Sequence, residues 1–261
     1  MRRAVGTGVL AIGLLVPFIP LLLWAVAGEF RYPAVVPELS GRGLGLILDP
    51  AVLDALLTSL AIAGAVAVLA ALIGAGAGRA LGLYAFRGRR FVQFLLLAPA
   101  IVPTLAVTLG IQVYFIRYGL ADSVAGVVLV QLVPTVPYVS LVMASAFANF
   151  DVESEDAARV LGAGPLRRLL LVTLPAVGPG LVVAALFAFL ISWSEYILTL
   201  LIGGGVVRTL PLLLFAEIGS SDLPAAAALS LVIALPPLLL VALTSRLLTG
   251  STPVAVGMRR L

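Results

Sequence analysis

Long apolar stretches, separated by short polar segments, cover most of the chain. A helix needs about 20 apolar residues to cross a bilayer, and six of the stretches reach that length. The pattern therefore predicts an all-α, polytopic membrane protein, organised as a single transmembrane domain over residues 1–261. The predicted spans are residues 5–27, 53–78, 91–114, 123–147, 175–202 and 225–248.

Three of these segments allow more than one interpretation. Residues 5–27 could be a cleaved signal peptide ending at Ala25-Val26-Ala27, but the run is longer than a typical signal core, which favours a retained span. Gly74 and Gly78 have GxxxG spacing, which fits a specific helix contact and generic packing of small residues equally well. The apolar residues 210–215 fit a short re-entrant helix slightly better than simple loop packing.

Composition narrows the class of protein. The chain is 62% hydrophobic and 11% charged, and its mean hydropathy is +1.22, values typical of a polytopic membrane protein. It has no cysteine and no histidine, which excludes disulfides, thiol catalysis and the common zinc and haem ligands. The net charge of +4 comes with arginines at the ends of the predicted spans, so it reflects membrane topology rather than nucleic-acid binding.

Arginine positions orient the six spans. Twelve of the sixteen basic residues fall on one side of the membrane and four on the other, so the positive-inside rule predicts that both termini and the loop after the fourth span are cytoplasmic. The minority side holds Arg31, Arg42, Arg117 and Arg208.

That loop, DVESEDAARVLGAGPLRRLLLVTLP at residues 151–175, is the longest strongly polar run in the chain. Asp151 is a plausible N-cap, and the acids that follow favour a helix start. Gly162 and Gly164 predict a break, and Pro165 suits the first turn of a second, amphipathic helix on the membrane surface.

The D-A-A-x-x-x-G pattern followed by L-P resembles the cytoplasmic "EAA" loop of permease subunits in type I, binding-protein-dependent ABC importers. The resemblance implies that residues 151–174, the coupling loop, dock on an ATPase subunit. It assigns the docking contacts to Glu155, Asp156, Ala157, Ala158, Gly162 and Ala163. The usual glutamate of the family falls on Asp156, with Glu155 just before it, so either acid could contact the ATPase.

The same resemblance implies the partners. These are two cytoplasmic ATP-binding subunits, a second permease subunit, identical or homologous, and an extracytoplasmic solute-binding protein. The chain itself has no phosphate-binding G-x-x-x-x-G-K-[ST] motif, so ATP hydrolysis is expected in a partner. No cofactor, metal or catalytic residue is predicted, and no nucleic-acid partner is expected.

The cargo is less constrained. Glu195 is the only acid well inside the fifth stretch, between Trp193 and Tyr196, and these three residues form a candidate substrate pathway. An interfacial aromatic belt with a solvated carboxylate fits equally well. Residues 192–230 resemble permeases of the polyamine, thiamine, iron(III) and sulfate branch, which implies a polyamine-like or other small charged solute. A sugar permease is the alternative within the class.

Other classes of membrane protein fit less well. A stand-alone secondary transporter would carry more polar groups inside the membrane and would need no docking loop. An intramembrane enzyme would need a catalytic set, and none is found. A structural subunit without transport activity is the remaining alternative.

Overall fold

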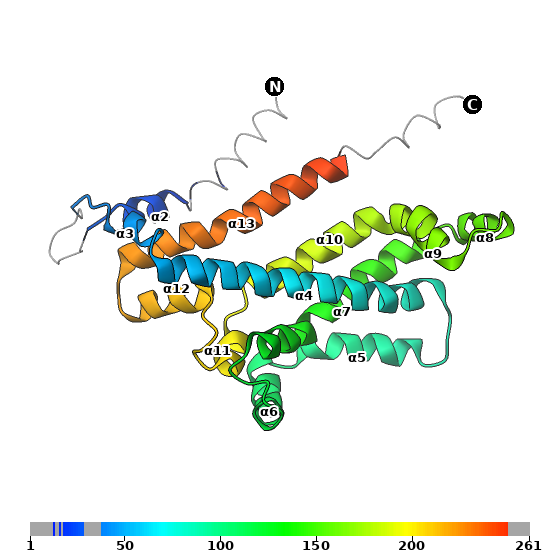
Figure 1. Cartoon of the computed structure of the whole chain (residues 1–261), viewed down its shortest axis with the longest axis horizontal. Coiled ribbons are helices and arrows are strands. Elements are labelled where there is room, and N and C mark those ends of the chain that lie inside the picture. The colour runs from blue at the N-terminus through cyan, green and yellow to red at the C-terminus, as the bar shows by residue number, and fades with distance from the viewer. Residues whose placement is uncertain (1–12, 14–15, 17, 29–37, 250–261) are drawn as a thin grey trace. The chain divides into compact units, whose positions relative to one another are not determined.

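The computed structural model describes residues 13, 16, 18–28 and 38–249 (Figure 1). These residues are predominantly helical, and the β contact among them is an isolated bridge between Ala27 and Leu39. Within the described ranges, four helical segments are long and apolar enough to cross a membrane, which confirms the predicted all-α, polytopic architecture. They are Pro50–Leu83, Val124–Ala148, Pro165–Trp193 and Leu223–Ser245.

The chain divides into two compact units, and two of the three boundaries between them fall inside long helices. Residues 1–59 and 208–238 form one unit, and residues 60–207 and 239–261 form the other. The helices concerned are α4 (Pro50–Leu83) and α13 (Leu223–Thr249).

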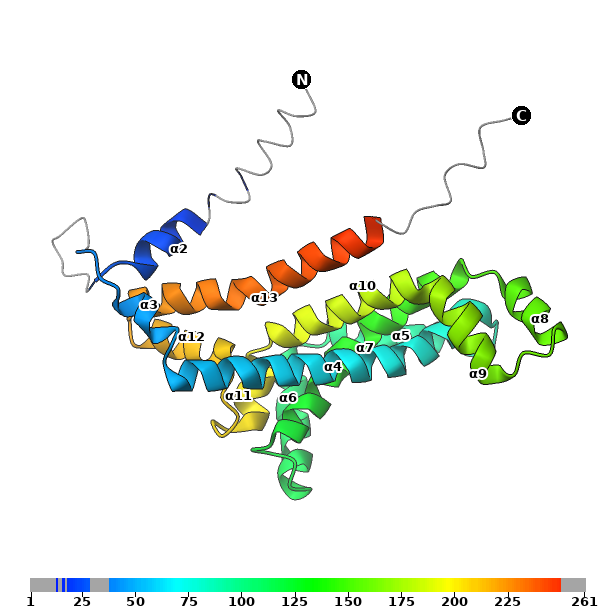
Figure 2. The same cartoon turned by 45° about the horizontal axis from the view of Figure 1, so that its top comes forward.

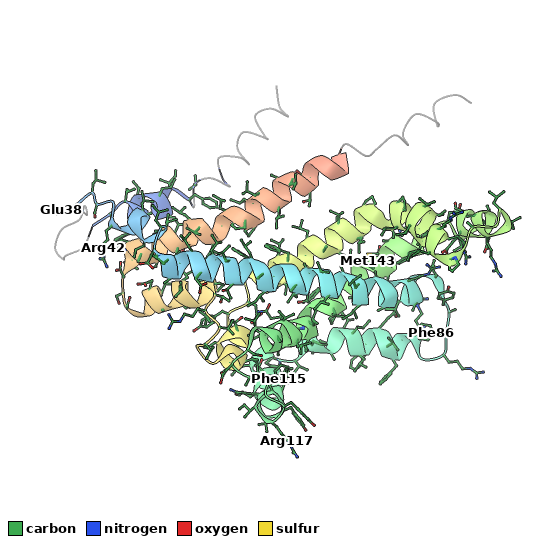
Figure 3. All side chains as sticks on the ribbon, in the orientation of Figure 1. Glu38, Arg42, Phe86, Phe115, Arg117 and Met143 are labelled. Atoms are coloured by element: carbon green, nitrogen blue, oxygen red, sulfur yellow. The ribbon has the colours of Figure 1, made fainter. Side chains whose placement is uncertain are left out.

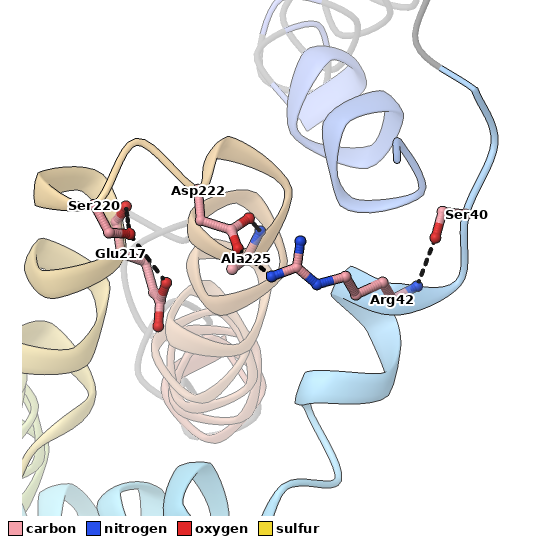
Figure 4. Close-up of polar contacts among 6 residues, drawn as sticks. All are labelled: Ser40, Arg42, Glu217, Ser220, Asp222 and Ala225. Atoms are coloured by element: carbon pink, nitrogen blue, oxygen red, sulfur yellow. Dashed lines mark hydrogen bonds and ion pairs between the residues drawn. The ribbon is translucent and has the colours of Figure 1, made fainter. Parts of the chain in front are cut away.

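The first unit contains α2 (Phe18–Ala25), α3 (Arg42–Leu46), α12 (Leu210–Gly219) and the adjoining parts of α4 and α13. Ala25, Ala227 and Ala228 form its buried centre. Arg42 bonds Asp222 at 2.6 Å, and Asp222 also accepts from the Ala225 amide at the start of α13 (Figure 4).

The first unit also bears on two predictions. The apolar residues 210–215 lie in a helix, α12, so the helical interpretation of that segment is confirmed. Most of the predicted span 5–27 lies outside the described residues; its described end is α2.

The second unit contains the rest of α4 and the helices that follow it. These are α5 (Arg89–Ile101), α6 (Thr104–Arg117), α7 (Val124–Ala148), α8 (Val152–Val160), α9 (Pro165–Arg168), the π-helical turn η1 (Leu169–Thr173), α10 (Leu174–Trp193) and α11 (Ile197–Gly203). Within this unit, α8 and α9 lie at the end where α4 turns into α5, and α6 and α11 lie at the other end (Figures 1 and 2).

Helices α4 and α7 approach closely through glycine. A Cβ atom on Gly78 would lie 2.4 Å from the Cβ of Met143, and one on Gly74 would lie 2.5 Å from Val139 Cγ1. Met143 is fully buried in this contact (Figure 3). The GxxxG spacing therefore marks a specific helix interface, which resolves the alternative left open by the sequence.

Two stretches predicted as single spans are broken in the structure. Residues 91–114 divide into α5 and α6, because Val102 precedes Pro103 and adopts extended backbone angles (φ −80°, ψ 132°) that end α5. Residues 175–202 divide into α10 and α11 at residues 194–196. A run of apolar residues does not reveal such breaks, because both pieces remain apolar.

Candidate functional site: the coupling loop

The sequence provides capping residues at both ends of helix α8, which stabilise it. The Asp151 carboxylate accepts from the Glu153 amide at 3.0 Å and from the Ser154 hydroxyl at 2.9 Å, which caps the helix as predicted. At the other end, the Gly162 amide donates to Arg159 O and the Ala163 amide donates to Ala158 O, both at 3.0 Å. This pair of backbone hydrogen bonds is a Schellman motif, and it needs the left-handed conformation of Gly162 (φ +82°).

Glu155 points into the protein, and both of its carboxylate oxygens have partners. Arg79 Nη2 lies 3.0 and 2.8 Å from the two oxygens, and the Thr173 hydroxyl donates to Oε1 at 3.0 Å. The Glu155 residue is only 9% exposed. This three-residue contact, the Arg79–Glu155–Thr173 link, joins α4, α8 and η1, elements far apart in the sequence.

Electrostatics favour the charged form of Glu155. Burial works to raise the pKa of this carboxyl, but the hydrogen bonds from Arg79 and Thr173 and the charges of Arg79 and Arg168 outweigh burial and lower the pKa below its usual value. The carboxylate therefore stays ionised at neutral pH and keeps the link intact.

Arg79 also contacts α7. Its guanidinium carbon lies 6.0 Å from the ring centroid of Phe147, which is in edge-to-face contact with Phe150 at 6.2 Å. Because Gly78 and Gly74 allow α4 to lie against α7, Arg79 can reach both Phe147 and Glu155. The coupling loop is thus fixed to two long helices.

The outer surface of the loop is apolar as well as charged. Val160 is 88% exposed and Leu161 is 87% exposed, and Asp156 and Arg159 are exposed beside them. Large apolar side chains with this exposure at the end of a short helix are typical of a binding surface rather than of a folded core. We call Asp156, Val160 and Leu161 the crest.

The predicted docking residues take different positions. Glu155 is buried, Asp156 and Ala157 are exposed, and Ala158 and Ala163 are half-buried. The prediction did not include Val160 and Leu161, although two adjacent large apolar residues just before a glycine break were the available signal. The docking role of these residues stays a prediction.

The second half of the loop differs from the expectation. The predicted surface helix with Arg167 and Arg168 is the four-residue α9, which continues through η1 into α10 without a break. Pro165 does begin the helix, but no turn-forming residue follows Arg168 to end it. A movement of α9 would therefore act directly on α10.

A groove of about 750 Å³ borders the loop. It runs between the end of α7, the start of α8 and the η1–α10 segment; its polar side chains all come from the α7–α8 side, and the η1–α10 side is apolar. Its lining includes Asn149, Asp151, Ser154, Leu171, Val172 and Pro175. The groove leaves the N-terminal part of α8 accessible.

The candidate substrate residues lie at the break between α10 and α11. Trp193 is 3% exposed and stacks on Phe189 with 5.6 Å between ring centroids. Glu195 is half-buried, and its Oε1 accepts from the Leu198 amide at 3.1 Å, at the start of α11. Tyr196 is half-buried. The three lie within four residues of one another at this break, and their part in transport stays a prediction.

Beside this break, uncharged polar groups connect three helices. Gln131 of α7 donates to the Thr199 hydroxyl of α11 at 2.9 Å and accepts from the Ser192 hydroxyl of α10. All three residues are buried. Sequence reasoning missed Gln131, whose signal was a lone amide inside an apolar span.

In the part of the chain that the structure describes, no candidate metal-binding site is found, because no three or more acidic residues lie close enough together to hold a metal ion.

The amino-acid sequence is similar to that of known membrane transport proteins. Residues 70–253 match the model of the "Binding-protein-dependent transport system inner membrane component" family. The chain is 29% identical to the putrescine transport system permease PotI of Escherichia coli K12 over 180 residues, 66% of this chain and 64% of PotI. It is 34% identical to the molybdenum transport system permease ModB of Mycobacterium tuberculosis over 233 residues, 83% of this chain and 84% of ModB.

A solved structure supports the same fold. A chain of a bacterial ABC transporter involved in the import of the acidic polysaccharide alginate matches with a TM-score of 0.69 and 18% identity, covering 94% of both chains. The match to the family model spans the end of α4, the coupling loop and the α10–α11 break. The chain therefore belongs to the family of inner membrane components of binding-protein-dependent transport systems.

Proposed function

We propose that this chain is the membrane subunit of an ATP-driven importer and that the crest docks on a cytoplasmic ATPase subunit. The observation that carries the proposal is the exposure of Val160 and Leu161 on a helix that is anchored at its base by the Arg79–Glu155–Thr173 link. An apolar crest on an anchored helix suits docking to a partner that pulls or pushes on it.

The distribution of arginine supports a cytoplasmic position for the loop and for both termini, because twelve of sixteen fall on that side. ATP hydrolysis then belongs to two partner subunits, and a second permease subunit, identical or homologous, completes the pathway. An extracytoplasmic binding protein delivers the cargo.

The mechanism follows from how the loop is attached. When ATP brings the two ATPase subunits together, the docked crest moves with them. Because α9 continues into α10 and Glu155 is bonded to Arg79 of α4, the movement reaches two long helices at once. Such helices then switch the pathway between inward-open and outward-open states.

The cargo is proposed to be a small charged solute. The similarity to a putrescine permease supports a polyamine-like cation, and the similarity to a molybdenum permease supports an oxyanion. Glu195, Trp193 and Tyr196 are the proposed pathway residues. Much of the choice of cargo is expected to lie in the binding protein.

Purification of the tagged chain from its own membranes tests the proposal. We expect an ATP-hydrolysing subunit to co-purify with the wild type and to be lost with Gly162→Pro, since proline cannot adopt a positive φ. Gly205→Pro, at another positive-φ glycine outside the loop, is the matched control and should retain the ATPase. Absence of an ATPase from the wild type under mild solubilisation would contradict the proposal.

A further inference from the structure

The turn between α4 and α5 carries a concentration of positive charge. Residues 84–93, which we call the basic turn, surround a hollow of about 710 Å³ lined by Ala85, Phe86, Arg87, Gly88, Arg89, Arg90 and Gln93. None of these seven lining residues is acidic. The hollow opens at the N-terminus of α5, where backbone amides and the helix dipole also favour an anion.

Among the described residues, the three arginines of the basic turn have no ionic partner. The ion pairs recorded among the described residues involve Arg42 and Arg79 but none of Arg87, Arg89 and Arg90. The Nε atom of Arg89 is buried and has no hydrogen-bond partner in the described part of the chain. Arg79, only eight residues before Arg87, shows the contrast, because its charge is matched by Glu155.

The surroundings of the hollow suit the surface of a membrane. Tyr84, Phe86 and Phe91 are 56%, 41% and 66% exposed, and Phe86 lies at the turn itself (Figure 3). Exposed aromatic rings next to arginine are typical of the depth of lipid headgroups. With 34 residues, α4 is about 51 Å long, more than the roughly 30 Å of a hydrocarbon core, so its end can reach that depth.

We propose that the basic turn binds the phosphate of an anionic phospholipid, with Arg89 and Arg90 as its main contacts and the aromatic rings beside its glycerol and acyl chains. Arginine suits this role because its planar guanidinium can make two bonds to one phosphate. A bound lipid would brace the end of α4 that carries Arg79 and hence the coupling loop. The proposal depends on the membrane location of the chain and not on its cargo.

Native mass spectrometry of the detergent-solubilised chain tests this site. The probe is phosphatidylglycerol, with phosphatidylcholine at the same concentration as the zwitterionic comparison. Each arginine near an anionic surface contributes roughly five-fold in affinity, so Arg89→Gln with Arg90→Gln should weaken phosphatidylglycerol binding by about 25-fold. The matched control, Arg117→Gln with Arg208→Gln, removes two exposed arginines elsewhere in the second and first units and should change binding less than about two-fold.

Three results would overturn the proposal: equal binding of phosphatidylcholine, equal weakening in the control variant, or displacement of the lipid by millimolar inorganic phosphate, which would indicate a site for the free anion. If the double variant does not fold, Arg87→Gln alone replaces it. Arg87 is exposed, so its removal leaves the core intact, and we expect about five-fold weaker binding.

Discussion

The coupling loop and the α10–α11 break differ in which side chains they bury, the acidic or the apolar ones. In the loop, Glu155 is buried and bonded to Arg79 and Thr173, while large apolar side chains face outward. At the break, the aromatic Trp193 is buried, while Glu195 is half-buried and bonds a backbone amide at the start of α11.

The difference distinguishes a surface suited to binding a partner from a region whose polar and aromatic groups are bonded within the protein. At the break, Gln131 donates to Thr199 and accepts from Ser192 inside the protein, and the Trp193 ring stacks on Phe189. In the loop, the acid completes an internal contact but leaves an apolar crest uncovered. Burial of such an exposed apolar surface by a partner lowers the free energy of the complex.

The largest expected effect comes from a charge on the crest. Leu161→Glu should weaken binding of the ATPase subunit by about 30-fold, roughly 2 kcal/mol, because a buried hot-spot contact is lost and a carboxylate is desolvated. The free energy of unfolding should change by less than about 0.5 kcal/mol, since Leu161 is exposed. Co-purification and thermal unfolding measure the two quantities.

Val206→Glu is the control for that variant. Val206 is also a large apolar residue with an exposed side chain (68% exposed), but it lies outside the crest, just after α11. Equal loss of the ATPase in both variants would show that the crest is not a special surface.

Glu155→Gln breaks the internal contact of the loop instead. It leaves Arg79 without its ionic partner, and because the Arg79 side chain is 31% exposed, water can solvate the charge in part. We therefore expect a loss of stability of about 1–2 kcal/mol, below the value for a fully buried pair, and a several-fold fall in ATP-driven uptake. Uptake equal to wild type would show that the link does not transmit movement.

The pH dependence of stability gives a second measurement on Glu155. Its pKa is lowered on folding, so the stability it contributes is fully present above the pKa of the unfolded chain and is lost as pH falls through the lower, folded value. Stability from this group should be constant from about pH 6 to 8 and decline below about pH 4. Denaturant unfolding of wild type and Glu155→Gln should converge at low pH; curves that stay parallel would exclude the ion pair as the cause.

Gln131→Leu changes the α10–α11 break without a change of charge. It leaves the Ser192 hydroxyl without its acceptor and removes a donor to Thr199, and hydrogen bonds between membrane helices contribute about 0.6 kcal/mol each. The expected loss of stability is about 1 kcal/mol, with ATPase binding unchanged. A loss of the ATPase would show that the two regions are energetically coupled.

Glu195→Gln should have the smallest effect on the fold. A glutamine oxygen can still accept from the Leu198 amide, so stability should change by less than about 0.5 kcal/mol. Uptake of a cationic cargo should nevertheless fall if Glu195 lines the pathway. Unchanged uptake would assign Glu195 to helix capping alone.

Much of this arrangement could be predicted from local sequence. The Asp151 cap, the Gly162 corner and the start of a helix at Pro165 depend on residues within a few positions of one another. The α4–α7 contact was also signalled, by Gly74 and Gly78, although the sequence did not identify the partner helix.

Long-range contacts could not be predicted in the same way. Glu155 lies 76 residues from Arg79 and 18 from Thr173, and no local pattern distinguishes it from the exposed Asp156 next to it. The breaks after Ile101 and Trp193 were not predicted because apolar residues continue on both sides of them, although Pro103 and the polar pair Ser194-Glu195 were local signals. The orientation of each side chain was decided by tertiary packing.

Site-specific cross-linking tests the central claim most directly, because the chain has no cysteine and a single introduced thiol is unique. We would introduce Val160→Cys in the crest and, as the control, Val206→Cys, and treat native membranes with a short thiol-to-amine cross-linker. The account predicts a product between Val160→Cys and a nucleotide-binding subunit, and none from Val206→Cys. Absence of that product, or equal products from both positions, would contradict the assignment of the crest as the ATPase-docking surface.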